Sequence, residues 1–159
     1  QVIIGFPHTT NLDTVRAMAL LNILKLPYHI LVKQELFKPV LAQVLTGLGC
    51  IPVNRKNSKN IVQQMVQQFA HAERFTLVIA PEATRGKNGA KPAIRTGFWQ
   101  IAKAANVPIV LMFADNVQQK GRILGKIYPS EDIQADLFSI QAIYAAQGVE
   151  VVLPTAKSA

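Results

Sequence analysis

The chain reads Val2-Ile3-Ile4-Gly5-Phe6-Pro7-His8-Thr9-Thr10-Asn11-Leu12-Asp13 near its start, and this stretch decides the fold class. Its first five residues are a short apolar run, which predicts a strand buried on both faces. The residues after it are polar and begin with a proline, so the strand is predicted to end there. A buried strand with a polar exit is typical of the parallel sheets of α/β proteins, whose sites lie at the carboxyl ends of the strands.

The same pattern continues along the chain. Further apolar runs predict strands at His29–Lys33, Cys50–Val53, Thr76–Ala80, Val107–Ala114 and Val149–Leu153. Amphipathic stretches predict helices at Thr14–Leu26, from Pro39 to Leu48, and at Ser58–Glu73, Thr96–Asn106 and Asp132–Gln147, with a loop and an edge hairpin at Asp115–Tyr128. We therefore predict one layered α/β domain over residues 1–159. Its sheet is mostly parallel, can be mixed by including an antiparallel strand, and is flanked by helices.

The composition restricts the classes of function. Half of the 159 residues are apolar and 16% are charged, which indicates a globular protein. The net charge is +8, and residues 1–110 hold 13 Lys or Arg against 4 Asp or Glu, whereas residues 111–159 hold 4 against 5. One cysteine and three histidines exclude a disulfide scaffold and a structural zinc module. The one-sided charge predicts an anionic partner: phosphate, nucleic acid or acidic membrane.

The segment after the first strand holds a candidate acid–base pair. His8 and Asp13 are five residues apart, so they would not meet on one continuous helix. They can meet if His8 lies in the turn and Asp13 in the first turn of the next helix, capped by Thr10 or Asn11. Asp13 would then orient the imidazole and leave its other nitrogen as a base, although a capping aspartate beside an incidental histidine is the simpler interpretation.

The segments that follow two further predicted strands contain basic residues. Arg55 follows the strand at Cys50–Val53, and Arg85 follows the strand at Thr76–Ala80. Such cations can form a fork for phosphate or carboxylate, although most Lys and Arg side chains are simply solvated. Glu82 lies among them, where a carboxylate can accept a substrate hydroxyl or hold Arg55.

The order of these motifs resembles that of the glycerolipid acyltransferases related to 1-acylglycerol-3-phosphate acyltransferase. The segment from His8 to Asp13 is similar to the family's HxxxxD motif, Gly49–Arg55 to its second motif and Pro81–Arg85 to its PEGTR motif. Val107–Val110 is similar to its fourth motif, and Lys33–Leu36 to its Lys-x-Glu-Leu segment. The motif-bearing part covers about residues 5–110, which is also the part that carries the excess charge.

The resemblance implies a glycerol-phosphate acyltransferase-like fold and acyl transfer from a thioester, acyl-CoA or acyl carrier protein, to a hydroxyl of a lysolipid or glycerol phosphate. It implies that His8 is the general base and that Asp13 orients it. The residues expected to bind the acceptor are Lys33, Arg55, Glu82, Thr84 and Arg85. Acyl-CoA or carrier protein would be a co-substrate, and the resemblance implies no metal and no other cofactor.

The sequence departs from the family pattern at Ala83, Asn54 and Gly86, where glycine, aspartate and serine are common. These changes bear on the identity of the acceptor more than on the type of reaction. No stretch is apolar enough for a membrane span, so we expect a cytoplasmic protein, peripheral on the inner face of an anionic membrane. The alternative is a non-catalytic module that binds anionic lipids through its basic face. Nucleic acid is not expected as a partner, because the sequence holds no recognised reader motif.

Overall fold

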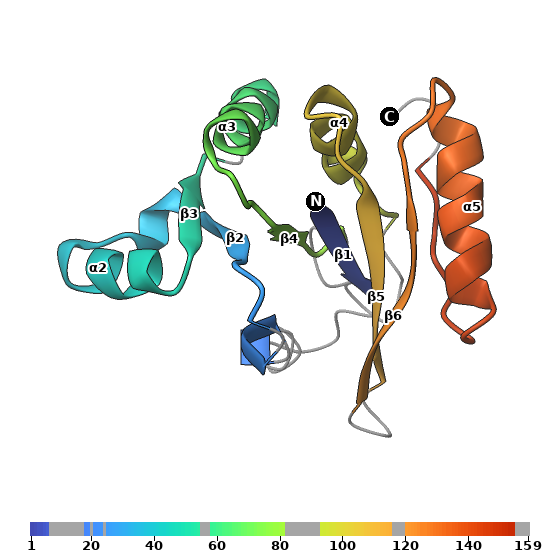
Figure 1. Cartoon of the computed structure of the whole chain (residues 1–159), viewed down its shortest axis with the longest axis horizontal. Coiled ribbons are helices and arrows are strands. Elements are labelled where there is room, and N and C mark those ends of the chain that lie inside the picture. Colours follow the sequence, from blue (N-terminus) through green and yellow to red (C-terminus); the bar gives the residue numbers. More distant parts are fainter. Residues whose placement is uncertain are drawn as a thin grey trace.

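The computed structural model describes residues 1–6, 18–19, 21–23, 25–54, 58–81, 93–115 and 120–154, and it shows an α/β domain built around one six-stranded sheet (Figure 1). The strands are β1 (Val2–Phe6), β2 (His29–Lys33), β3 (Cys50–Val53), β4 (Leu77–Ile79), β5 (Ile109–Asp115) and β6 (Lys120–Ile127). The helices are η1 (Gln34–Leu36), α2 (Pro39–Gly47), α3 (Ser58–His71), α4 (Gly97–Ala104) and α5 (Ile133–Ala145). The predicted fold class is confirmed.

The strand order in the sheet is β3-β2-β4-β1-β5-β6. The first five strands in this order are parallel, and β6 runs antiparallel to β5 at the edge. Val2 of β1 pairs with Leu77 on one side and with Ile109 on the other. The segment predicted as a loop and an edge hairpin, Asp115–Tyr128, contains one strand, β6, which pairs with the preceding strand β5, and the sheet is mixed.

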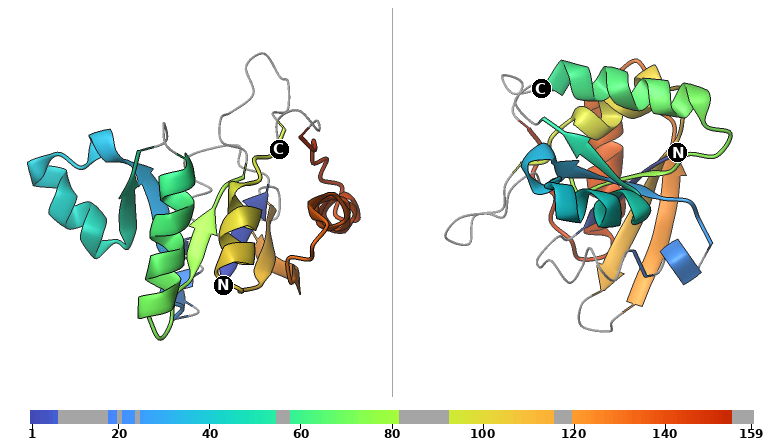
Figure 2. Two further views of the ribbon diagram at one scale, coloured as in Figure 1. Left: turned by 90° about the horizontal axis from the view of Figure 1, so that it is seen from above. Right: turned by 90° about the vertical axis from the view of Figure 1, so that its left-hand side faces the viewer.

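The two faces of the sheet are covered by different layers. Val2 and Ile4 of β1 pack into the larger core with the buried side chains of α3, α4 and α5. Ile3, between them, packs on the other face with Leu21, which lies in the described helical residues 21–23. Figure 2 shows α3 and α4 lying together on one side of the strands. Because the side chains of β1 alternate between the two faces of the sheet, this strand contributes to the hydrophobic layer on each face, as expected for a buried parallel strand.

Polar side chains join the helices to this core. The Asp136 carboxylate accepts hydrogen bonds of 2.7 Å from the Trp99 indole N–H and from the Ser130 backbone N–H. Asp132 caps α5, because its carboxylate accepts from the N–H groups of Gln134 and Ala135. Trp99 is half-buried against the core. None of the described helices has the length and apolar character needed to cross a bilayer.

One predicted strand is wrong. Residues 149–153 are not in the sheet, although Val151 is 2% exposed and belongs to the core. The carbonyl of Val152 accepts from the Ile94 N–H at 2.9 Å, and the carbonyl of Val151 accepts from the Gln141 side chain at 2.7 Å. The apolar run correctly indicates burial. Its backbone, however, pairs with a loop and a helix side chain.

The predicted helix boundaries shift by a few residues. Ser58–Glu73 ends at His71, Thr96–Asn106 is shortened to Gly97–Ala104, and Asp132–Gln147 is shortened to Ile133–Ala145. Pro39 is the first residue of α2, as predicted. Within Thr14–Leu26, the described residues 18–19 and 21–23 are helical.

The hydroxyl of Tyr144 lies fully buried between two central strands. It is 3.1 Å from the carbonyl of Ile4 and 3.0 Å from that of Met112. Burial also raises the pKa of this phenol, so it remains a hydrogen-bond donor at all physiological pH values.

We predict that Tyr144→Phe lowers the free energy of unfolding by about 1–2 kcal/mol in urea titrations, because a buried donor to the carbonyls is lost. Tyr128→Phe, at a residue 62% exposed, should change it by less than about 0.5 kcal/mol; equal effects would contradict this role.

Candidate active site

The four strands that precede the predicted motifs along the chain are adjacent in the sheet. In the order β3-β2-β4-β1 the strands are parallel, so their carboxyl ends lie at the same edge. β1 ends two residues before His8, β2 ends at Lys33, β3 ends two residues before Arg55, and β4 ends three residues before Glu82. Neighbouring strands are about 4.8 Å apart, so these four ends span about 14 Å. The segments that leave the sheet here can therefore contribute to one site.

The structure places one of the predicted site residues. Lys33 is exposed at the end of β2, and its backbone pairs with Val53 of β3. This register puts Lys33 beside the segment that continues to Arg55. The other predicted site residues lie outside the described residues: His8, Asp13, Arg55, Glu82, Thr84 and Arg85.

The segment that contains Glu82 starts from a fixed point. Pro81 is buried, and its carbonyl accepts a hydrogen bond of 3.0 Å from the Arg95 N–H. This bond joins the described residues on either side of residues 82–92. The exposed Arg95 therefore has its backbone at the carboxyl end of β4.

One cation at this edge was missed by sequence reasoning. Arg122 of β6 pairs with Phe113 of β5, which in turn pairs with Phe6, the last residue of β1. Its guanidinium lies 5.5 Å from the centre of the Phe113 ring. Arg122 thus adds positive charge beside the exit of β1. No motif marks it in the sequence, because its position depends on the antiparallel register of β6.

Two cavities lie at opposite edges of the sheet. The larger, about 510 Å³, is lined by residues such as Gln1, Thr76 and Val107, which precede strands and so mark the amino edge. The smaller, about 280 Å³, lies at the carboxyl ends of β2 and β3 beside α3. Its lining residues are Gln34, Pro52, Asn54, Asn60, Ile61 and Gln64. Amides donate and accept hydrogen bonds, so this smaller cavity can bind hydroxyl groups beside the candidate site.

The described cysteine and the first described histidine, Cys50 and His29, lie at the amino ends of their strands, away from the carboxyl edge to which His8 is assigned. Cys50 is half-buried in β3, and burial raises the pKa of its thiol, which disfavours the reactive thiolate. His29 starts β2 at the amino edge and stacks on Phe75 with ring centres 4.4 Å apart. Burial lowers the pKa of this half-buried imidazole, and a hydrogen bond with the Thr76 backbone opposes that shift. His71 ends α3 and its ring is hydrogen-bonded to the Gln67 carbonyl.

The fold belongs to the class of α/β proteins whose sites lie where parallel strands end. The sequence profile of the Acyltransferase family matches residues 1–113, and the chain belongs to this family. The structure is also similar to the crystal structure of the 1-acyl-sn-glycerophosphate (LPA) acyltransferase, PlsC, from Thermotoga maritima, with a TM-score of 0.60 and 12% sequence identity. This match covers 92% of the present chain but 63% of the PlsC chain, and at this identity it establishes the shared fold. The comparison with curated proteins gives no match.

The alignment of β2 with β3 depends on Gly49, which lies beside Tyr28 at the amino ends of the two strands. Gly49 has a φ of +74°, and a β-carbon there would lie 2.5 Å from the carbonyl oxygen of Tyr28. We predict that Gly49→Ala lowers the free energy of unfolding by about 2 kcal/mol or more, because the backbone must leave the left-handed region and move from Tyr28. The control is Gly47→Ala, where a β-carbon has no neighbour within 4 Å. It should be neutral or stabilising by up to about 1 kcal/mol in the same denaturation assay. A Gly49→Ala variant as stable as the wild type would contradict the prediction.

Proposed function

We propose that this acyltransferase moves a fatty acyl group from acyl-CoA or acyl carrier protein to a hydroxyl of a lysophospholipid-like acceptor such as 1-acylglycerol-3-phosphate. The observation that carries the proposal is the convergence of four strand ends that lead into the family's motifs. The similarity in fold to PlsC supports the glycerolipid class of acceptor. Phosphate on the acceptor fits the basic residues that follow these strands.

In the proposed reaction His8 takes the proton of the acceptor hydroxyl as its oxygen attacks the thioester carbonyl. Asp13 orients the imidazole and stabilises its protonated form. The tetrahedral intermediate carries a negative oxygen, for which backbone N–H groups at the start of the helix after His8 are suitable donors. When this intermediate collapses, the carbon–sulfur bond breaks and the thiolate takes the proton back from His8. The products are the ester and the free thiol, and His8 returns to its starting state.

The acceptor would be held by its phosphate. In the proposal Lys33, Arg55 and Arg85 neutralise the phosphate, while Glu82 and Thr84 bind the glycerol region. Lys33 supports this assignment, because its register with β3 brings it beside the segment of Arg55. Acyl-CoA or carrier protein serves as co-substrate, with no metal or other cofactor in the proposal. We further propose a cytoplasmic location, peripheral on the inner face of an anionic membrane, with no nucleic acid as partner.

The first test concerns the base. We expect His8→Ala to reduce the turnover of acyl-CoA with lysolipids by about 10²–10⁴-fold, because a positioned general base contributes a factor of this size. Products from a panel of acyl-CoA donors and lysolipids are identified by mass spectrometry. The control is His71→Ala, which alters an exposed histidine at the end of α3 and should retain activity. Wild-type activity in His8→Ala would refute the mechanism. A wild type that binds phospholipid and forms no product with any donor would favour the non-catalytic module.

The second test concerns the acceptor phosphate. We expect Lys33→Gln to raise the KM for a phosphorylated acceptor about tenfold while kcat changes little, because a charge-assisted contact to the phosphate is lost. Lys126→Gln, on the exposed surface of edge strand β6, is the matched control and should leave KM unchanged. A KM effect of equal size with an acceptor that lacks phosphate would contradict the role of Lys33.

A further inference from the structure

Helix α2 exposes an apolar stripe. Val40, Val44 and Leu48 follow one another at a spacing of four residues and are 86%, 57% and 47% exposed, and Leu41 beside them is 49% exposed. α2 contains no buried residue. A helix that joins two adjacent parallel strands normally buries such a stripe on the sheet. Apolar clusters left open in this way mark interaction surfaces.

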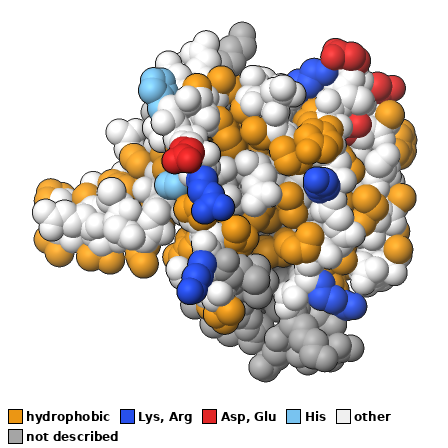
Figure 3. All heavy atoms as spheres, in the orientation of Figure 1, with side chains coloured by type: hydrophobic (Ala, Val, Ile, Leu, Met, Phe, Trp, Pro, Cys, Tyr) orange, Lys and Arg blue, Asp and Glu red, His pale blue; other side chains and the backbone are white. Residues whose placement is uncertain are grey.

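The position of α2 explains why the stripe is open. β3 is the edge strand of the sheet, and α2 lies beyond it (Figure 1). Figure 3 shows this part of the molecule as an arm that extends from the main body, with apolar side chains along it. Ala42 and Leu45 of the arm are half-buried, so the helix has a side that packs on its own chain and a second side that does not.

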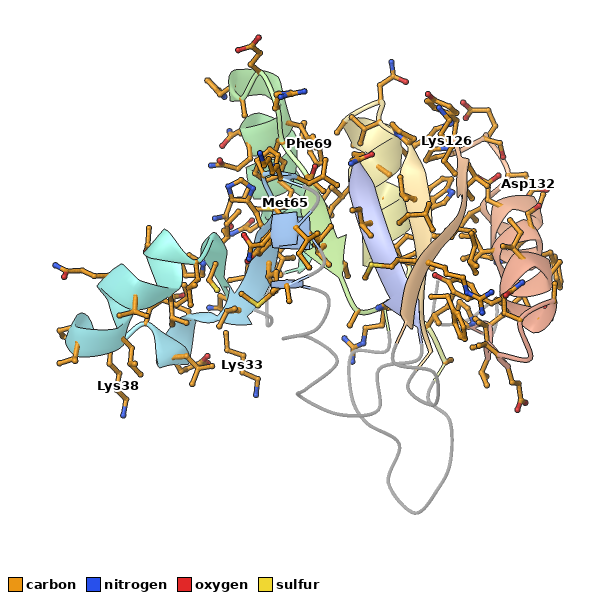
Figure 4. The ribbon with its side chains drawn as sticks, turned by 60° about the horizontal axis from the view of Figure 1, so that its bottom comes forward. Lys33, Lys38, Met65, Phe69, Lys126 and Asp132 are labelled. Carbon is orange, nitrogen blue, oxygen red and sulfur yellow. The ribbon has the colours of Figure 1, made fainter. Side chains whose placement is uncertain are left out.

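Along the chain, the charged residues near α2 are mostly basic. α2 itself carries no ionised side chain, and residues 25–60 hold six Lys or Arg against one acid, Glu35. Lys33 and Lys38 are both exposed ahead of the helix, and Figure 4 shows their side chains extending to the same side of the molecule. An apolar stripe flanked by lysines is the pattern of a helix that lies in the interface of an anionic bilayer.

We propose that the α2 arm, defined as Leu36–Leu48, docks onto an anionic lipid bilayer by inserting its apolar stripe at the headgroup level. The inference rests on the proposed function in that the bilayer would also hold the lysolipid acceptor. A lipid surface fits better than a second copy of the chain. In a two-fold pair of arms the same basic rim would face itself, whereas anionic headgroups neutralise it.

The arm and the candidate site share one attachment to the sheet. β2 ends at Lys33, η1 follows at once, and α2 begins at Pro39. The docked arm would therefore hold the carboxyl edge of the sheet at a fixed distance from the lipid surface. Lys38 lies outside the proposed acceptor site, which allows the electrostatic part of docking to be tested apart from acceptor binding.

The test measures co-sedimentation with vesicles of phosphatidylcholine alone or with one quarter phosphatidylglycerol. We expect binding to the anionic vesicles, weakened roughly tenfold or more in Val40→Asp/Val44→Asp because charges replace inserted apolar groups. Lys38→Gln should weaken it about fivefold on anionic vesicles and leave binding to neutral ones unchanged. The matched control is Phe138→Asp, which alters an apolar side chain 59% exposed on α5, and it should bind as the wild type does. Absence of binding by the wild type, or equal binding by the double variant, would overturn the proposal.

If the double substitution impairs folding, a second variant provides an independent test of insertion. Val40→Trp should strengthen binding, and its fluorescence should shift to the blue and be quenched by brominated lipid in anionic vesicles. Trp99 gives a constant background, since its indole is bound to Asp136. Unchanged emission would count against insertion. A wild-type dimer in light scattering that becomes monomeric in the double variant would assign the arm to a second copy and overturn the proposal.

Activity assays separate this inference from the proposed function. Val40→Asp/Val44→Asp should retain wild-type turnover on a water-soluble short-chain acceptor and lose it on the same headgroup embedded in vesicles. Loss on both acceptors at unchanged vesicle binding would overturn the docking role. Suppose that the wild type binds vesicles but is inactive on every acceptor, and that the double variant loses vesicle binding. This result would support the docking surface and contradict the proposed acyl transfer.

Discussion

The two-sided pairing of β1 is the constraint on which the rest of the structure depends. Val2 and Ile4 pair with β4 on one side and with β5 on the other, so both backbone edges of the strand are satisfied within the sheet. Its side chains are buried on both faces as well. A strand fixed in this way ends at a defined point, Phe6, and the segment with His8 leaves from there. Because β4 and β2 continue the parallel order outward, the other motif-bearing segments leave at the same edge.

The alternation of apolar runs and amphipathic stretches predicts most strands and helices, because it reports which side chains are buried. It does not report which backbone groups pair, and residues 149–153 show the difference, since Val151 is buried without a strand partner. The spacing in α2 likewise predicts a buried stripe, but the sheet ends at β3 and leaves it open. For the site, sequence reasoning identifies Lys33 through its motif, whereas Arg122 depends on a register set across two strands.

The asymmetry of charge has a structural basis. In the last third of the chain three of the five acids have these roles in the fold: Asp132 caps α5, Asp136 accepts a hydrogen bond from Trp99, and Glu131 pairs with Lys103. These carboxylates lie on the side of α5, away from the strands that carry the motifs. These three carboxylates are engaged by α5, Trp99 and Lys103, so they are not available to neutralise the other basic residues of the first two-thirds. Neutralising them inside the fold would remove the field that attracts an anionic ligand.

The proposed docking surface and the proposed acceptor site support each other through geometry. Once the enzyme is docked, it meets a bilayer-bound acceptor by diffusion within the plane of the membrane. The effective concentration of the acceptor at the site is therefore higher than for an enzyme free in solution. This gain requires that the docked enzyme presents its carboxyl edge to the lipid, and that the connection between arm and edge is short. The five residues between Lys33 and Pro39 meet the second condition, because they span less than about 20 Å even when fully extended. A basic edge beside an apolar arm would then orient the whole domain, with the phosphate of the acceptor and the headgroups of the membrane drawn to the same side.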